Sequence, residues 1–210
     1  MSGPLILPLR CPRCAGPLAG LPHDVVFWCG GCQMPLEVVQ GRLVVRRGRT
    51  AKATLDLPGK GRHLPLWAMR VHVVSQWDDP EREANARRLP PAEWVYVTAF
   101  DLLNPSYFGD PGLIFTQRRV SLEPATPALA VGCIRSLEEA KAFVEPHLLT
   151  IIDRRVDVTG LTLSAVVEEV VLWGIPFADQ GDSLQDCIVG LKYPAAALND
   201  VGSLRTLDVS

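Results

Sequence analysis

The fold of this chain is decided near its start by Cys11-Pro-Arg-Cys14 and, after 14 intervening residues, by Cys29-Gly-Gly-Cys32. Two C-x-x-C pairs at this separation are close to the two-knuckle pattern of zinc sites. Each C-x-x-C turn lets two thiolates converge on one ion while backbone N–H groups point at the sulfurs. Gly16 and the two glycines inside the second pair are expected to supply the permissive backbone dihedrals of such turns. We therefore predict one tetrahedral Zn²⁺ held by Cys11, Cys14, Cys29 and Cys32.

The segments beside the cysteine pairs alternate as β-strands do. Residues 25–28 lead into the second pair, and residues 36–39 and 43–45 flank Gln40-Gly41. Because Gly readily takes a positive φ, Gln40-Gly41 is a suitable two-residue hairpin turn. The prediction is a small three-stranded sheet clamped by the metal.

In these two knuckles and the hairpin behind them, residues 8–46 resemble the zinc-ribbon (rubredoxin-like) superfamily. The resemblance implies a structural Zn²⁺. Rubredoxins proper hold iron and usually carry Cys-Pro-x-Cys-Gly at the second knuckle, whereas this chain has Cys29-Gly-Gly-Cys32-Gln, which argues against electron transfer. Zinc with four thiolates has no open coordination position, so no direct catalysis by the metal is expected. A ribbon this small should gain most of its folding free energy from metal binding.

Two other interpretations of the site are less favoured. A redox dithiol would sit where a strand enters a helix, but the pattern around both cysteine pairs is that of β-hairpins. His23 is a further candidate ligand, yet it lies in mid-loop away from both knuckles and is expected to be exposed. The remaining cysteines, Cys133 and Cys187, lie in apolar surroundings and are predicted to be buried thiols.

The composition is that of a folded chain: 48% of residues are hydrophobic, 21% are charged, and the mean hydropathy is +0.15. No apolar run approaches the roughly 20 residues of a membrane span, and Met1–Arg10 lacks the basic start of a signal peptide. We expect a soluble cytoplasmic protein. In a reducing compartment, paired cysteines more often bind metal than form disulfides.

Charge divides the chain into a basic head and an acidic body. Residues 1–63 hold nine basic and three acidic residues, and the rest hold 12 basic and 20 acidic ones. The predicted organisation is a zinc ribbon over residues 1–46, a partly mobile basic linker over 47–63, and an α+β domain over 64–210. Residues 42–63 could contact nucleic-acid phosphates, but they lack interleaved aromatics for stacking, so a solvated tether is favoured.

The body reads as strand, strand, helix, helix, strand, strand. Strands are predicted at residues 64–77 and 93–100, joined by an exposed excursion over 78–91, and at residues 163–177 and 184–191. This order is typical of an α+β domain with an antiparallel sheet.

The first predicted helix begins with Asp110 as N-cap and Pro111 in its first turn, and ends near Arg119. Ser136 and Glu139 form a capping-box pattern before a second helix that reaches Leu148. Pro146 is expected to disturb the last turn of that helix.

The body carries no phosphate loop, no G-x-S-x-G elbow and no H-E-x-x-H helix. His72 and His147 are interpreted as structural. Glu168 and Glu169 are adjacent on a predicted strand, so they are expected to point to opposite faces. Six aromatic residues either line a ligand pocket or, as favoured, fill the core; they are Trp94, Tyr96, Phe100, Tyr107, Phe108 and Phe115.

Three functions fit these observations. The leading hypothesis is a non-catalytic zinc-binding adaptor or assembly factor that acts through protein partners. The alternatives are nucleic-acid binding by the ribbon and its basic arm, and an accessory subunit whose body contributes a pocket to a larger enzyme.

Overall fold

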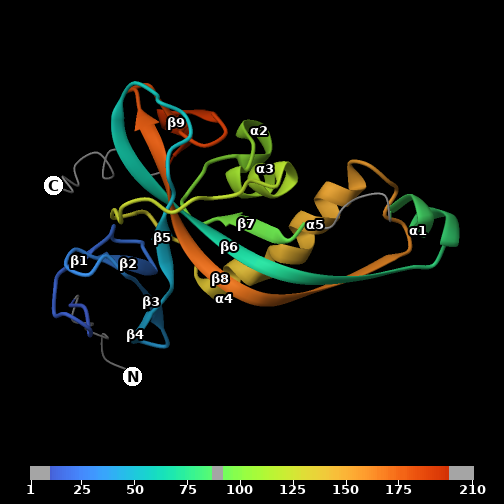
Figure 1. The fold of residues 1–210 in the computed structure, drawn as a ribbon, viewed down its shortest axis with the longest axis horizontal. Coiled ribbons are helices and arrows are strands. Elements are labelled where there is room, and N and C mark those ends of the chain that lie inside the picture. Colours follow the sequence, from blue (N-terminus) through green and yellow to red (C-terminus); the bar gives the residue numbers. More distant parts are fainter. Residues whose placement is uncertain (1–9, 87–91, 199–210) are drawn as a thin grey trace.

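The structure is a computed structural model that describes residues 10–86 and 92–198 of the 210-residue chain (Figure 1). It contains a four-stranded sheet in the order β1-β2-β3-β4 and a larger sheet in the order β10-β9-β8-β6-β7, with β5 beside β8. The predicted α+β class, with a β ribbon followed by a mainly antiparallel sheet, is confirmed.

The first sheet is the ribbon. Its strands are β1 (Leu18–Ala19), β2 (Val26–Cys29), β3 (Pro35–Val39) and β4 (Arg42–Val45), all antiparallel. The turn between β3 and β4 has positive φ at both central residues, 48° at Gln40 and 75° at Gly41. Two positive φ values are typical of a type I′ hairpin turn, and the predicted hairpin is confirmed.

The second sheet is built on two long strands, β6 and β8, that pair antiparallel along their whole length and form an arm (Figure 1). The arm continues beyond the short edge strand β7, and α5 packs on one of its faces. The strands of this sheet are β5 (Gly48–Thr50), β6 (Lys60–Trp77), β7 (Trp94–Thr98), β8 (Leu161–Asp179), β9 (Ser183–Asp186) and β10 (Lys192–Pro194).

The segment predicted to be a linker contains strand structure. β5 pairs parallel with β8, with Arg49 opposite Trp173, and β6 already begins at Lys60. The strand β5 therefore attaches the end of the ribbon to the body sheet. Within the predicted excursion between β6 and β7, residues 80–86 form a helix, and residues 87–91 lie outside the described ranges.

Two helix starts are where the sequence placed them. The Asp110 side chain accepts a hydrogen bond of 2.9 Å from the Leu113 N–H, and Ser136 and Glu139 form the complete capping box. The helices are α1 (Pro80–Ala86), α2 (Pro105–Phe108), α3 (Pro111–Arg118), α4 (Leu137–Ala142) and α5 (Val144–Asp153), with a 3₁₀ turn at Ala195–Ala197.

The second predicted helix is in fact two helices. The break falls at Phe143, and Pro146 lies in the first turn of α5 instead of disturbing a last turn. A proline is tolerated there because the first N–H groups of a helix have no intrahelical partner. The prediction that Pro146 disturbs the last turn of a helix was therefore wrong.

A β-bulge interrupts the long arm. Arg70 lies opposite Glu169, but the next residue, Val71, lies opposite Val167, so Glu168 is the extra residue. An extra residue shifts the alternation of side chains. Both Glu168 and Glu169 accordingly contact Arg70, at 3.6 and 3.7 Å, and the expectation that they point to opposite faces was wrong.

Ribbon and body share an apolar core. Val26 and Trp28 of β2 are 0% and 1% exposed and belong to the same buried cluster as Trp67 and Leu172. The backbone joins the two parts as well, since the Val25 N–H donates to the Cys133 carbonyl at 2.8 Å. Within the described residues, no helix combines the length and apolar character needed to cross a membrane.

Candidate metal centre

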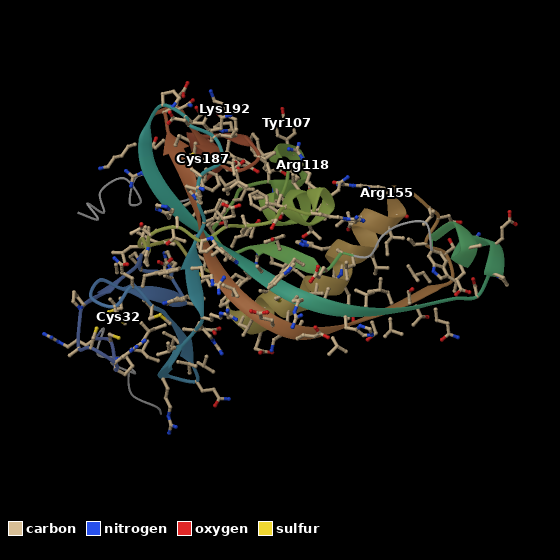
Figure 2. All side chains as sticks on the ribbon, viewed as in Figure 1. Cys32, Tyr107, Arg118, Arg155, Cys187 and Lys192 are labelled. Carbon is tan, nitrogen blue, oxygen red and sulfur yellow. The ribbon has the colours of Figure 1, made fainter. Side chains whose placement is uncertain are left out.

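The four predicted thiols converge on the ribbon, where Figure 2 labels Cys32. The four Sγ atoms all lie within 4.8 Å of one another; they belong to Cys11, Cys14, Cys29 and Cys32. The Cys11–Cys32 and Cys14–Cys29 sulfur pairs are 3.7 and 3.3 Å apart. A tetrahedral ion with Zn–S bonds of about 2.3 Å requires sulfur separations of about 3.8 Å. The donor set therefore fits a tetrahedral thiolate-bound metal ion.

The two knuckles repeat one backbone pattern. Ala15 donates to the Cys11 carbonyl and Gln33 to the Cys29 carbonyl, both at 2.8 Å. The residue after each pair is left-handed, with φ of 57° at Ala15 and 55° at Gln33. Two equivalent turns that face each other are what a four-thiolate site requires.

The nearby glycines have a different role from the one expected. The positive φ values fall on Ala15 and Gln33, whereas Gly16 and Gly31 give space to the sulfurs. A Cβ at either glycine would lie 3.2 Å from the Cys14 Sγ. The sequence indicated that these glycines matter. It did not indicate the reason, which is that a side chain at these positions would crowd the cysteine sulfurs.

Backbone N–H groups support the sulfurs electrostatically. Arg13 donates to the Cys11 Sγ and Cys32 donates to the Cys29 Sγ, each at 3.4 Å. Although burial opposes ionisation of Cys29, backbone N–H groups and the Cys14 thiol lower its pKa to about 6. Burial raises the pKa of Cys32 to about 12. Crowded thiols share protons unless a cation replaces them, so metal binding here must release protons.

The other candidate ligands do not join this cluster. Among residues 10–86 and 92–198, these four cysteines are the only group of three or more side chains placed to hold a metal ion. His23 is exposed in its loop, as predicted, and His72 is exposed on β6. His147 is buried, with its Nδ1 3.1 Å from the Tyr96 carbonyl oxygen. Cys133 and Cys187 are buried as predicted, which raises the pKa of both thiols.

The basic segment over residues 42–63 is largely neutralised by acidic side chains. At least four of its basic residues form ion pairs. These pairs are Arg46–Glu37 at 2.5 Å, Arg47–Glu169, Lys52–Glu123 at 3.5 Å and Arg62–Asp179 at 3.1 Å. The basic head and the acidic body thus complement each other within one molecule.

Glu37 connects the ribbon to the body. Its carboxylate is 2% exposed and contacts Arg46 through one oxygen. The other oxygen accepts a hydrogen bond of 2.9 Å from the Leu137 N–H at the start of α4. Asp24 makes a second connection, because it accepts hydrogen bonds from Leu21 and from Gly132 of the body.

The aromatic residues of the body divide between core and cavity. Phe100 and Phe115 are buried, as the favoured interpretation expected, while Tyr107 projects from α2 with 79% of its surface exposed (Figure 2). Trp94 and Tyr96 line a cavity of about 450 Å³ on the body sheet. A second cavity, of about 360 Å³, lies between the ribbon and the loop at residues 124–127.

Comparisons with known proteins gave no assignment: no protein-family model, no curated protein and no solved structure matches this chain.

Proposed function

We propose that this protein is a non-catalytic, zinc-stabilised binding protein that acts as an adaptor or assembly factor through contacts with other proteins. The observation that carries the proposal is a four-thiol cluster whose ribbon is continuous with the body core. Zinc is the ion proposed, because it favours closed tetrahedral thiolate sites in structural ribbons. Such an ion holds the ribbon in shape and takes no part in chemistry. A cytoplasmic location, where thiols stay reduced, belongs to the same proposal.

The exposed face of the β6–β8 arm supports binding to another protein. Val74 and Val166 lie on this face with 56% and 59% of their surfaces exposed, and α5 covers the opposite face. Exposed aliphatic residues on a paired sheet face offer a flat surface to a partner. The arm also keeps a regular backbone there, so a partner would meet a preformed surface.

Nucleic-acid binding through residues 42–63 is a weaker candidate. At least four of the seven basic residues in this segment already pair with carboxylates of the same chain. A phosphate contact at any of these paired residues would have to replace its ion pair, which reduces the gain from counterion release. The accessory-subunit alternative is favoured by the cavity beside Trp94, which a larger enzyme could use.

The first experiment measures metal content by plasma emission and partners by crosslinking mass spectrometry in the native cell. We expect about one zinc per chain and a protein crosslinked at the arm. The variant Val166→Glu should abolish the crosslinks and keep the zinc. Val45→Glu, on an exposed valine of the ribbon, is the matched control and should keep both. Salt-sensitive nucleic-acid binding without a protein partner, or iron in place of zinc, would overturn the proposal.

A further inference from the structure

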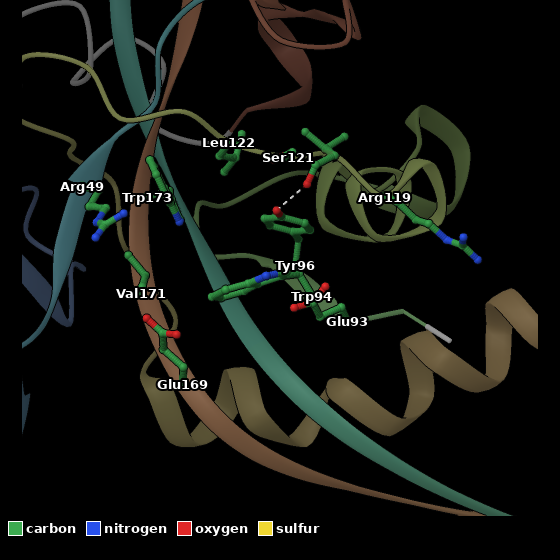
Figure 3. A pocket seen from close by; sticks show the side chains of 11 residues that line it. Arg49, Glu93, Trp94, Tyr96, Arg119, Ser121, Leu122, Glu169, Val171 and Trp173 are labelled. Atoms are coloured by element: carbon green, nitrogen blue, oxygen red, sulfur yellow. Dashed lines mark hydrogen bonds between the residues drawn. The ribbon is translucent and has the colours of Figure 1, made fainter. Parts of the chain in front are cut away.

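A cavity of about 450 Å³ is built on one face of the body sheet, where three strands place their side chains side by side (Figure 3). Across this face Tyr96 of β7 lies opposite Ala68 of β6, and Ala68 lies opposite Val171 of β8. Directly paired residues share a face of a sheet. Tyr96 and Val171 therefore lie on the same face of the sheet. The volume is within the range of small-molecule sites, roughly 300–1,000 Å³.

One part of the cavity lining is aromatic and aliphatic. Trp94 and Tyr96 of β7 and Trp173 of β8 line it, with Val171 and Leu122 beside them. The Tyr96 hydroxyl donates a hydrogen bond of 2.6 Å to the Val120 carbonyl, which fixes the loop that forms one wall (Figure 3). Burial raises the pKa of Tyr96 to about 12, so this hydroxyl stays protonated and the wall stays in place at neutral pH.

The charges at the cavity are not equivalent. Glu169 is held by two arginines, Arg47 and Arg70, and so is compensated. Arg49 lies with its guanidinium carbon 5.8 Å from the centre of the Trp173 ring. In the part of the chain that the structure describes, Arg49 makes no ion pair. Figure 3 shows Arg49 at the side of Trp173 and Arg119 directed away from the aromatic residues.

From this arrangement we propose that the cavity binds a small planar organic anion, an aromatic ring that carries one carboxylate. The ring would lie against Trp94 and Trp173, because aromatic surfaces give offset or edge contacts to flat apolar groups. The carboxylate would meet Arg49, whose planar fork of donors matches two carboxylate oxygens. This site belongs to the body and does not depend on the metal or on the proposed adaptor function.

A cationic ligand is the obvious competitor, since aromatic residues also bind ammonium groups. Two observations argue against it. The Trp173 ring already has a cation beside it, and the Glu169 carboxylate that could attract another is occupied by Arg47 and Arg70. Glu93, next to Trp94, also lines the cavity, but beside Trp173 the charged group without an ion pair among the described residues is the Arg49 guanidinium, and it favours an anion at that end (Figure 3).

The test uses three probes with the same ring system: 2-naphthoate, 2-naphthalenemethanol and 2-naphthylmethylammonium. Binding to the full-length zinc-loaded protein is measured by calorimetry, and the site is located from the indole N–H signals in ¹H–¹⁵N spectra. Replacement of Trp94 and Trp173 by Phe, one at a time, assigns those signals. We expect 2-naphthoate to bind at least tenfold more tightly than either other probe and to shift the signals of Trp94 and Trp173.

The variant Arg49→Gln should remove this preference and leave 2-naphthalenemethanol binding unchanged. Arg49 is an exposed side chain, so the variant should fold. Arg155→Gln, at another exposed arginine away from the cavity (Figure 2), is the matched control and should bind like the natural chain. Equal binding of the three probes, tighter binding of the ammonium, a preference that survives Arg49→Gln, or no binding at millimolar concentration would each overturn the proposal.

Discussion

The ribbon and the body keep their shapes by different means. The ribbon's own apolar cluster consists of Cys11, Cys29 and Leu36, so two of its three fully buried members are candidate metal ligands. The body has two extensive buried clusters, which cover both faces of its sheet. The free energy gained from hydrophobic burial is proportional to the apolar area removed from water, and the small ribbon can bury little such area. A metal ion bound by the four cysteines would therefore stabilise the ribbon as burial stabilises the body.

The separation between the two regions is not complete. Val26 and Trp28 of β2 pack into the buried core of the body. Glu37 joins the ribbon to α4 through its hydrogen bond from the Leu137 N–H. The outer part of the ribbon, with its knuckles, should therefore respond to the metal, and β2 should respond to both. Four variants test this division, in order of decreasing expected effect.

Loss of one thiol should have the largest effect. Cys29→Ser removes a buried ligand whose sulfur lies 3.3 Å from the Cys14 sulfur. Structural zinc sites contribute roughly 10–16 kcal/mol of apparent binding free energy, so we expect zinc to fall from one per chain to near zero. Hydrogen exchange should become fast in β3 and β4 and stay slow in β6 and β8. Cys187→Ser, at a buried thiol outside the cluster, is the control and should retain the zinc.

If Cys29→Ser kept one zinc per chain, the proposed metal centre would be wrong. If it instead unfolded β6 and β8 together with the ribbon, the division between ion and core would not hold.

The second variant weakens the apolar core of the body and leaves the four cysteines unchanged. Leu172 is 0% exposed and packs in the cluster between β6 and β8. Leu172→Ala should lower the free energy of unfolding by about 2–5 kcal/mol through lost burial and a residual cavity. Below its lowered melting temperature, the variant should keep one zinc per chain. Leu103→Ala, at a leucine with 41% of its surface exposed, is the control and should change the melting temperature little. Loss of zinc from folded Leu172→Ala would show that the core also maintains the knuckles.

A third variant acts on the connection between the two regions. Glu37→Gln removes a negative charge that contacts Arg46, while its amide oxygen can still accept from Leu137. Arg46 keeps 25% of its side chain exposed, so screening reduces the effect to about 1–2 kcal/mol. The measurement is chemical denaturation, with hydrogen exchange at the Leu137 amide as a local probe. Glu138→Gln alters an exposed pair with Lys141 and should leave stability unchanged. Equal results for both variants would mean that Glu37 does not join ribbon to body.

The features that the sequence predicted depend on residues close together in the chain. The knuckles, the Gln40-Gly41 turn and the caps at Asp110 and Ser136 each involve partners within about five residues. Their chemistry can be recognised without knowledge of the fold. The two αL residues, Ala15 and Gln33, were missed because neither type favours a positive φ.

The features that the sequence did not predict depend on distant partners. β5 was assigned to a linker because three residues carry no strand pattern, and its pairing with β8 joins positions that only the tertiary fold brings together. The same holds for the cavity: Trp94 and Tyr96 were noted as pocket candidates, but Arg49 and Trp173 come from elsewhere in the chain. The alternation of Val171 and Trp173 along β8 was the available signal for one more wall. The bulge at Glu168 gave no signal at all.

The smallest expected effect is a pH dependence that belongs to the body. Burial lowers the pKa of His147 in the folded protein, an effect that Asp110 and the Tyr96 carbonyl partly offset. An unfolded histidine has a pKa of about 6.5. Below that pH the unfolded chain takes up a proton that the folded protein does not, so stability falls as pH decreases, by at most about 1.4 kcal/mol per pH unit. Burial also lowers the pKa of His63, which acts in the same direction.

The measurement is the urea midpoint between pH 7.5 and 5.5, with zinc content determined at each point so that metal loss is recognised. His147→Gln should make the slope shallower but not abolish it, because His63 remains. His72→Gln, at an exposed histidine on β6, should keep the slope of the natural chain. If the urea midpoint of His147→Gln depended on pH as steeply as that of the natural chain, His147 would not contribute to the pH dependence of stability. If the slope instead followed zinc loss at every pH, acid would act through the thiols, and the ribbon would be the pH-sensitive region instead of the body.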